Sequence, residues 1–370
     1  MNNPTVRRIV LAAGAPVSAF VLAVVVSSIV LIISGSNPFT AYGDMIENAS
    51  RLETMIDTLN EAVPLYLSGV AAAIGFRMNL FNIGVEGQYL IAAFFAAVIG
   101  AAVELPPVLH VLLILIVAMF SGAVYAGIAG LLKVTRGVNE VISTIMLNSI
   151  AVGGIIAWLI REFQDDTSTT NLGTKPIADS GLIPDLNGFV EIFTREITGG
   201  RELTGLIVLA VVVGVVYHLF INRTRLGFDF RASGINPMAA KAGGVPPKRM
   251  VLYAMLLSGL VAGLVGMPEL LSEQGNYEQS FRQGLGFSGI AVALLGRNNP
   301  AGIAVGALLF GLLSSSSAIL QVSGSATPEI VIIMQGVIVL AAVISYEVVG
   351  RIRARDEART AREATVGVPA

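Results

Sequence analysis

The chain has 370 residues, of which 54% are hydrophobic and 13% are charged, and its mean hydropathy is +0.77. Soluble domains carry about 25% charged residues, so this composition excludes an ordinary soluble protein and indicates a chain that crosses a membrane repeatedly. The net charge of −2 provides no basic field for nucleic acid, and the absence of cysteine excludes disulfides and thiolate metal sites.

Apolar runs separated by charged residues, proline or glycine predict about ten transmembrane helices. In chain order, the spans are expected at residues 9–34, 62–76, 80–103, 108–132, 138–160, 203–221, 250–271, 284–295, 301–320 and 330–349. The first run is longer than the apolar core of a signal peptide, so we expect it to remain as a span. The predicted fold is therefore all-α, a polytopic membrane protein in which some helices are short or broken.

Most of the 23 lysines and arginines fall in alternate loops, on the same side of the predicted spans as the N-terminus. The positive-inside rule assigns this side to the cytoplasm, which predicts an even number of spans and two cytoplasmic termini. We expect residues 1–370 to form a single transmembrane domain. A weak similarity, an echo of one segment in the other, relates Arg77-Met78-Asn79 to Gly296-Arg297-Asn298. An internal repeat is therefore one interpretation of the sequence.

Four segments lie outside the predicted spans. Residues 35–61 form an outer segment whose partly helical periodicity predicts an interfacial helix. Residues 161–202 form an outer loop, and a loop of this length is interpreted either as a solvated lid or as a docking surface for an external partner. Residues 222–249 form a cytoplasmic loop, and residues 350–370 form a cytoplasmic tail that should fray.

The cytoplasmic loop contains the pattern of one short helix. Asn236 is a good N-cap, and Pro237 suits the first helical position. Residues 238–242 are mostly helix formers, and Gly243 and Gly244 should end the helix. A helix of fewer than two turns is not stable alone in water, so this one needs another surface to pack against.

Motifs of soluble enzymes are absent from the sequence. It contains no Gly-x-x-x-x-Gly-Lys-Ser/Thr phosphate loop, no His-Glu-x-x-His zinc motif and no Gly-x-Ser-x-Gly nucleophile elbow. His110 and His218 lie far apart near apolar runs, where a structural histidine is a better interpretation than a metal ligand. We therefore expect no enzymatic activity, no catalytic residue, no metal site and no cofactor bound by this chain.

A first group of polar residues opens the third predicted span, at a depth where such side chains are costly and are candidates for function. It consists of Asn79, Asn82, Glu86 and Gln88. The spacing predicts that Asn79, Asn82 and Glu86 share one helix face. Two interpretations stay open: hydrogen bonds that hold the bundle together, or the polar lining of a substrate path or its gate.

A second polar group opens the fifth span and consists of Asn139, Glu140, Ser143, Thr144 and Asn148. Both groups are dominated by carboxamides and hydroxyls, which suit a neutral polyol or base better than an inorganic ion. Acidic residues within the spans are few, which argues against proton coupling. The same two interpretations apply to this group.

Three stretches of the chain carry a family resemblance. They are Asn82-Ile-Gly-Val-Glu86-Gly-Gln88, Gly137-Val-Asn-Glu140-Val-Ile-Ser-Thr-Ile-Met-Leu-Asn148 and Arg231-Ala-Ser-Gly-Ile-Asn236-Pro-Met-Ala-Ala240. As a set they resemble permease subunits of bacterial ABC importers, in the ribose and simple-sugar permease family and its nucleoside (basic-membrane-lipoprotein-dependent) branch. The resemblance extends over residues 62–346.

The resemblance implies that the central loop is the coupling element that docks on a cytoplasmic ATPase. The residues implied in that contact are Arg231, Ser233, Gly234, Asn236, Pro237, Ala239 and Ala240. The family also implies a separate ABC ATPase with two ATPase domains, which would bind ATP and magnesium. Its other expected partners are a second permease, a different chain, and an extracytoplasmic substrate-binding lipoprotein. The expected location is the bacterial cell membrane.

The leading hypothesis is therefore the permease of an ABC importer that moves nucleosides by ATP-driven alternating access. One alternative is a permease for ribose or another simple sugar. An alternative of a different class is a secondary carrier or channel that works without an ATPase.

Overall fold

The computed structural model describes residues 4–165, 172–188, 201–325 and 327–366. In these ranges the regular secondary structure is helical, and the only β-type pairs are three isolated bridges. The chain divides into two compact units, residues 50–315 and residues 1–49 with 316–370. The two units are taken in turn.

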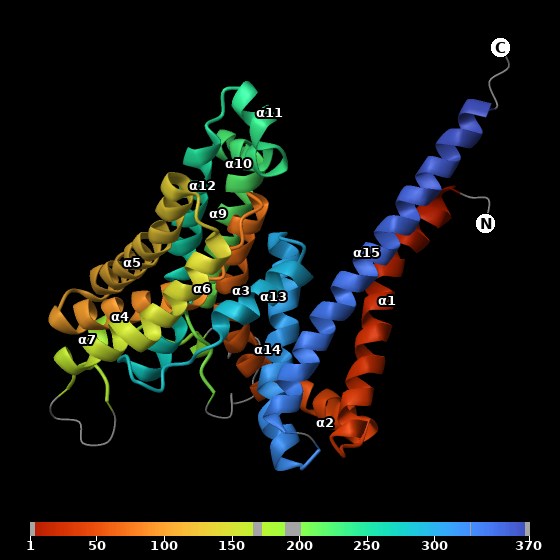
Figure 1. Ribbon diagram of the computed structural model, residues 1–370. Helices are drawn as coiled ribbons and strands as arrows, with labels where there is room; N and C mark the ends of the chain where they lie inside the picture. Colours follow the sequence, from red (N-terminus) through yellow and green to blue (C-terminus); the bar gives the residue numbers. More distant parts are fainter. Residues whose placement is uncertain (1–3, 166–171, 189–200, 326, 367–370) are drawn as a thin grey trace. The chain divides into compact units, whose positions relative to one another are not determined.

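The larger unit, residues 50–315, contains most of the helices (Figure 1). In chain order these are α3 (Leu52–Arg77), α4 (Val85–Ala102), α5 (Pro107–Arg136), α6 (Glu140–Ile150), the π-helical η1 (Ala151–Ile156), α7 (Ala157–Glu162), the 3-10 turn η2 (Asp179–Gly181), α9 (Ile207–Arg223), α10 (Arg225–Ile235), α11 (Pro237–Ala242), α12 (Pro247–Ala262), the π-helical η3 (Glu269–Gln274), α13 (Leu285–Leu295) and the first part of α14 (Pro300–Val322).

The smaller unit contains α1 (Pro4–Ile33), α2 (Pro38–Ala49), the end of α14 and α15 (Pro328–Val366). Helices α1 and α15 run side by side (Figure 1). Helix α2 turns back from α1 at an angle of 117°. The Ser325 hydroxyl donates to the Asp44 carboxylate at 2.5 Å, which ties α2 to the turn before α15.

Six helices of the described residues are long and apolar enough to cross a membrane, and eight if each of two bent helix pairs counts as one span. Each of the ten predicted spans overlaps a helix, but α12 and α13 are too short to pass this criterion alone. The all-helical, multi-pass fold is thus confirmed, whereas the count of ten spans and the location of the termini stay predictions.

Several predicted boundaries differ from the structure. Helix α12 ends at Ala262 instead of residue 271, and α15 continues to Val366, beyond the predicted end at residue 349. Helix α3 begins at Leu52, ten residues before the predicted span, so part of the outer segment continues directly into it. Helix α4 begins at Val85 instead of residue 80. The reason is local: the Asn82 Oδ1 accepts the Gly84 N–H at 3.0 Å, and this Asx turn competes with helix formation.

Small residues allow a close helix crossing in the larger unit, between α5 and α12. A Cβ atom added to Gly122 would lie 2.3 Å from the Gly259 carbonyl oxygen, and one added to Gly263 would lie 2.1 Å from the Ala118 carbonyl oxygen. Membrane helices that present such residues at four-residue spacing pack backbone against backbone. This crossing helps to enclose α4, whose membrane-spanning window is 72% buried.

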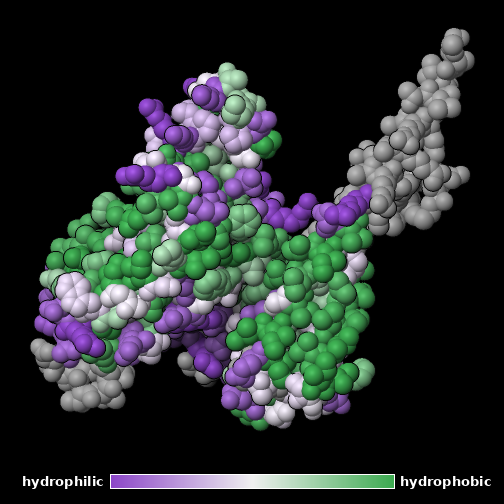
Figure 2. Space-filling view, in the orientation of Figure 1, coloured by the Kyte–Doolittle hydropathy of each residue, from purple (hydrophilic) through white to green (hydrophobic). Residues whose placement is uncertain are grey.

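The surface of the larger unit is apolar around its long helices and carries hydrophilic residues at both ends of them (Figure 2). Figure 2 shows hydrophobic residues over α5, α6 and α13, and hydrophilic residues where α10, α11 and the beginning of α12 project. Exposed aliphatic side chains on long helices are expected where a helix faces lipid. The projecting end carries the loop that the sequence singled out.

Candidate functional site

A buried hydrogen-bond network forms where the chain enters α4. The Asn82 Nδ2 donates to the Gln88 Oε1 at 2.9 Å and to the Ser258 Oγ at 2.8 Å. The Gln88 Nε2 donates back to the Asn82 Oδ1 at 2.9 Å, and the Ser258 hydroxyl donates to the Ala71 carbonyl at 2.7 Å. Asn82 and Gln88 are each 1% exposed. These bonds join α3, α4 and α12 at one point.

Asn148 of α6 connects to the same region from the other side. Its Oδ1 accepts the Gly87 N–H and its Nδ2 donates to the Ile83 carbonyl, both at 2.9 Å. A Cβ atom on Gly87 would lie 2.9 Å from the Asn148 Oδ1, so glycine is needed at position 87 for α6 to approach. The amide of Asn148 therefore pins α6 to the beginning of α4.

Glu86 binds the N-terminus of α13. Its Oε1 accepts the Gly284 N–H at 2.6 Å, and its Oε2 accepts the Gly286 N–H at 2.8 Å. The Tyr89 hydroxyl lies within bonding distance of the same carboxylate, at 3.2 Å, and of the Arg282 carbonyl, at 2.8 Å. Glu86 is 5% exposed. A carboxylate at this position satisfies orphan N–H groups and opposes the positive end of the α13 dipole.

The other residues of the second group bond mainly within their own helix. The Asn139 side chain caps α6 by accepting the Val141 N–H at 2.8 Å. The Ser143 and Thr144 hydroxyls donate to carbonyls one turn earlier. Glu140 pairs with Lys133 of α5 across the intervening turn.

Asn79 is the exception among the candidates of the first group, because its side chain is exposed. The prediction that Asn79, Asn82 and Glu86 share a helix face is wrong, since the chain is helical only from Val85. Asn79 has φ 56°, as has Asn298, the matching residue of the echo seen in the sequence. The Arg77 guanidinium and the Tyr217 hydroxyl both donate to the Asn298 carbonyl, at 2.8 and 3.0 Å, so the two turns are bonded together.

Most candidate polar residues thus bond protein partners. The bonds of Asn82, Glu86 and Asn148 cross between helical segments, whereas the other residues of the second group bond mainly within α6. Sequence reasoning missed Ser68 and Ser258, whose hydroxyls donate to carbonyls of other helical segments, and Arg282, which makes a bidentate ion pair with Glu61 at 2.9 and 2.7 Å. The sequence did contain a signal for the two serines, because each lies inside an apolar run. A serine side chain inside a membrane is rarely left without a hydrogen-bond partner. A role of these groups in a substrate path stays a prediction.

The described part of the loop at residues 161–202 is bonded to the segment after η3. The Thr174 N–H donates to the Tyr277 carbonyl at 2.9 Å, and the Ile177 N–H donates to the Gly275 carbonyl at 2.8 Å. His110, which is fully buried, bonds the Ser180 hydroxyl through Nδ1 and the Gly100 carbonyl through Nε2, both at 2.9 Å. This histidine therefore fastens the loop to α4 and α5.

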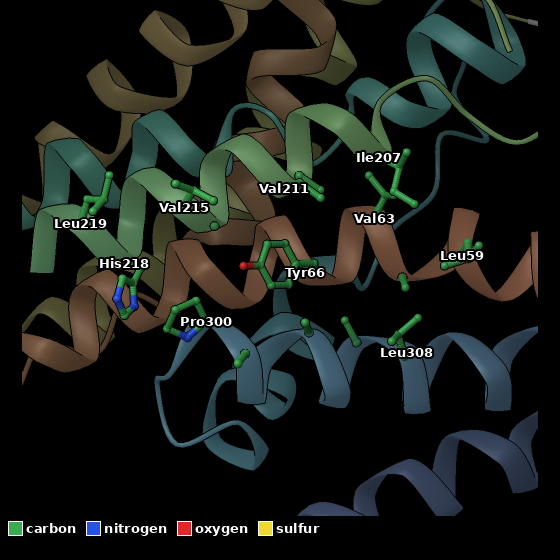
Figure 3. Close-up of a pocket in the computed structure, with 16 residues that line it drawn as sticks. Leu59, Val63, Tyr66, Ile207, Val211, Val215, His218, Leu219, Pro300 and Leu308 are labelled. Atoms are coloured by element: carbon green, nitrogen blue, oxygen red, sulfur yellow. The ribbon is translucent and has the colours of Figure 1, made fainter. Parts of the chain in front are cut away.

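An apolar groove of about 490 Å³ lies between α3, α9 and α14 (Figure 3). Aliphatic side chains form its walls, and Tyr66 and His218 are its polar residues. Tyr66 packs against Gly214, where a Cβ atom would lie 2.0 Å from the tyrosine oxygen. The groove lacks the converging polar groups of a site for a polar ligand.

The loop at residues 222–249 contains two helices instead of the single predicted one. The predicted cap is confirmed, because the Asn236 Oδ1 accepts the Met238 and Ala239 N–H groups at 3.0 Å each. The predicted end is confirmed as well, with Gly243 at the C-cap of α11 and Gly244 at φ +85°. Helix α10 was missed because its sequence is polar and glycine-containing, and it gains stability by packing against α9 and α12.

The implied coupling residues divide into buried and exposed groups. Ser233 and Ala240 are 1% and 6% exposed, and a Cβ atom on Gly234 would lie 2.8 Å from the Arg77 carbonyl oxygen. The Arg231 guanidinium donates to the Ile221 carbonyl at 2.7 Å. Asn236, Pro237 and Ala239 are exposed.

The most exposed large apolar side chains of this loop belong to residues that the motif did not single out. Ile235 is 86% exposed and Met238 is 78% exposed. They flank the exposed cap of α11, and we call these two side chains the α11 tip.

Comparison with known proteins identifies the family. The pattern described as branched-chain amino acid transport system / permease component matches residues 54–343. The chain belongs to this family. It is therefore a permease component, a multi-pass membrane protein that serves transport and is not an enzyme.

Three relatives match most of the chain. The guanosine ABC transporter permease protein NupP of Bacillus subtilis is 32% identical over 90% of this chain and 93% of its own length. The glucose ABC transporter permease protein TsgB13 of Haloferax volcanii is 31% identical over 89% and 87%. The nucleoside ABC transporter permease protein NupB of Lactococcus lactis is 30% identical over 94% and 93%.

Proposed function

We propose that this permease is the transmembrane subunit of a binding-protein-dependent ABC importer that brings nucleosides into a bacterial cell. The assignment of nucleosides as the substrate rests on the similarity, over at least nine-tenths of the chain, to two permeases named for guanosine and for nucleosides. The buried carboxamides and hydroxyls of the helix bundle agree with an uncharged substrate. In this proposal the chain crosses the cell membrane ten times with both termini in the cytoplasm.

The proposed coupling surface for the ATPase is the α11 tip. Exposed isoleucine and methionine on a polar projection are the kind of apolar patch that marks a protein contact. In this proposal Ile235 and Met238 enter the ATPase surface, whereas Ser233 and Gly234 hold the helix in place. ATP and magnesium would be bound by the ATPase alone.

Movement of the α11 tip has a direct route into the helix bundle. Gly234 lies against the turn at Arg77, and the Arg77 guanidinium bonds the Asn298 carbonyl at the end of α13. The other end of α13 is held by Glu86 of α4. ATP-driven displacement of α11 would therefore shift α3, α4 and α13 together, and such a shift changes the balance between outward-open and inward-open states.

A second permease is the expected partner within the membrane. Each of the three organisms has a further relative of this chain: the guanosine permease protein NupQ of Bacillus subtilis, the nucleoside permease protein NupC of Lactococcus lactis and the putative glucose permease protein TsgC13 of Haloferax volcanii. We infer that this chain likewise pairs with a different permease. A lipoprotein outside the membrane would deliver the substrate.

Uptake of radiolabelled guanosine and uridine tests the substrate. Cells that carry the transport genes should accumulate label, and cells without the gene for this chain should not. The sugar alternative has support from the glucose permease TsgB13, so labelled ribose and glucose are measured in parallel. Sugar uptake that depends on this gene, with unchanged nucleoside uptake, would replace nucleosides by sugars in the proposal.

Charge substitutions at the α11 tip test the coupling surface. Ile235→Asp and Met238→Asp should abolish co-purification of the ATPase while leaving insertion in the membrane intact, because neither side chain is needed inside the fold. Thr135→Asp, at the exposed end of α5, is the matched control. Normal ATPase binding by both tip variants would remove the assignment.

A further inference from the structure

A second pocket lies beside α11 and shares Ile235 with the α11 tip. It has a volume of about 380 Å³. It is bounded by the turn after α3, the end of α5, the junction of α10 with α11 and the beginning of α12. We call it the Ser233 pocket, and the residues that characterise it are Met78, Asn79, Lys133, Ser233, Ile235 and Lys248.

Ser233 provides the first indication of a ligand. Its side chain is 1% exposed, it lines the pocket, and its Oγ has no hydrogen-bond partner among the described residues. A buried hydroxyl without a partner destabilises the folded state, because it has lost its hydrogen bonds to water. Serine on a helix ordinarily bonds a carbonyl one turn earlier, as Ser143 and Thr144 do here. A ligand that accepts a hydrogen bond would satisfy this hydroxyl.

Positive charge provides the second indication. The ammonium group of Lys248 is exposed and makes no ion pair within the part of the chain that the structure describes. Lys248 follows the first residue of α12, a helix that begins without a capping side chain, so its N-terminal dipole is not opposed locally. Lys133 also lines the pocket, with its charge partly balanced by Glu140.

Apart from Asn79, the remaining walls of the pocket are apolar. The pocket is also lined by the apolar side chains of Met78, Leu80, Ile235 and Val251. A ligand that fits must therefore combine an anionic group that accepts hydrogen bonds with an apolar or planar body. Phosphate matches the polar half, because hydroxyl, lysine and the N-terminus of a helix are recurrent phosphate ligands.

We propose that the Ser233 pocket binds the phosphate group of a phosphorylated molecule on the cytoplasmic side of the permease. Two sources have this chemistry: a nucleoside monophosphate, whose base would lie on the apolar wall, and the headgroup of an anionic phospholipid. The choice of a nucleotide as probe rests on the proposed nucleoside transport, whereas the phosphate site itself does not.

The test uses the full-length chain alone in nanodiscs of zwitterionic lipid, so that no ATPase contributes nucleotide sites. Binding of guanosine monophosphate, inorganic phosphate and guanosine is measured by titration calorimetry. The monophosphate should bind, with phosphate as a competitor. Ser233→Ala and Lys248→Ala should each weaken binding about tenfold or more, since one charge-assisted hydrogen bond is worth at least this factor. Arg249→Ala is the matched control, because Arg249 is exposed beside Lys248 and does not line the pocket.

The lipid source is tested with the same variants. Native mass spectrometry counts phosphatidylglycerol retained by the chain from mixed nanodiscs, and selective loss of one lipid in Lys248→Ala and Ser233→Ala identifies the headgroup as the occupant. Failure of both phosphate probes to bind, or equal binding by the wild type and the two pocket variants, overturns the proposal. Neither result depends on nucleoside uptake, so failure of the transport hypothesis is detected separately.

Discussion

Glu86 is the residue for which the structure predicts the largest effect of a single change. Replacement by alanine removes the acceptor of two buried N–H groups, at Gly284 and Gly286. Each unsatisfied buried donor costs about 1–3 kcal/mol, and loss of the carboxylate at the N-terminus of α13 adds about 0.3–2 kcal/mol. We therefore expect Glu86→Ala to destabilise the folded state by roughly 2–8 kcal/mol.

Glu86→Gln separates the shape of this side chain from its charge. The amide oxygen can accept one of the two N–H groups, but the amide nitrogen faces the other donor. The expected loss is therefore about 1–3 kcal/mol, smaller than for alanine. Glu104→Gln, an exposed carboxylate on the loop between α4 and α5, is the control and should change stability by less than about 0.5 kcal/mol.

Unfolding in mixed micelles by a denaturing detergent measures the stabilities, and hydrogen exchange of the peptide that covers α13 (Leu285–Leu295) localises the effect. Faster exchange in α13 should accompany the lower stability. If Glu86→Ala matched the Glu104→Gln control in both measurements, the carboxylate would not hold α13. If Glu86→Gln were stable but slowed uptake strongly, Glu86 would belong to the substrate path instead.

Three further predictions concern contacts of the larger unit. Gly259→Val should disrupt the α5–α12 crossing and lower expression of folded protein. Gly153→Val is the control and should be tolerated, because an added Cβ atom there has no neighbour within 4 Å. The two variants are compared by their thermal stability in detergent. His110→Ala should free the outer loop and speed limited proteolysis there, and unchanged cleavage would contradict the role of the histidine as a fastener. A double-mutant cycle of Arg282→Ala and Glu61→Ala should give a coupling energy near 1 kcal/mol, because both side chains are partly solvated; zero coupling would mean that the pair is incidental.

The sequence alone determined the class of the protein and much of its local structure. Composition and hydropathy suffice for a helical membrane protein, because every backbone group inside a bilayer needs an internal partner. The cap of α11 at Asn236 and its end at Gly243 were also predictable. These signals lie within a few residues of one another, so no knowledge of the fold is needed to interpret them.

The tertiary structure decided which polar residues meet. Asn82 finds Ser258 at a separation of 176 residues along the chain, and Glu86 finds Gly286 at a separation of 200. The spacing of residues within one span could not identify these partners. The same spacing predicted a common helix face for Asn79, Asn82 and Glu86, but the Asx turn at Asn82 prevents a helix there. Ser233 is a further example. The sequence motif identified this residue, but the pocket around it exists only because four chain segments pack together.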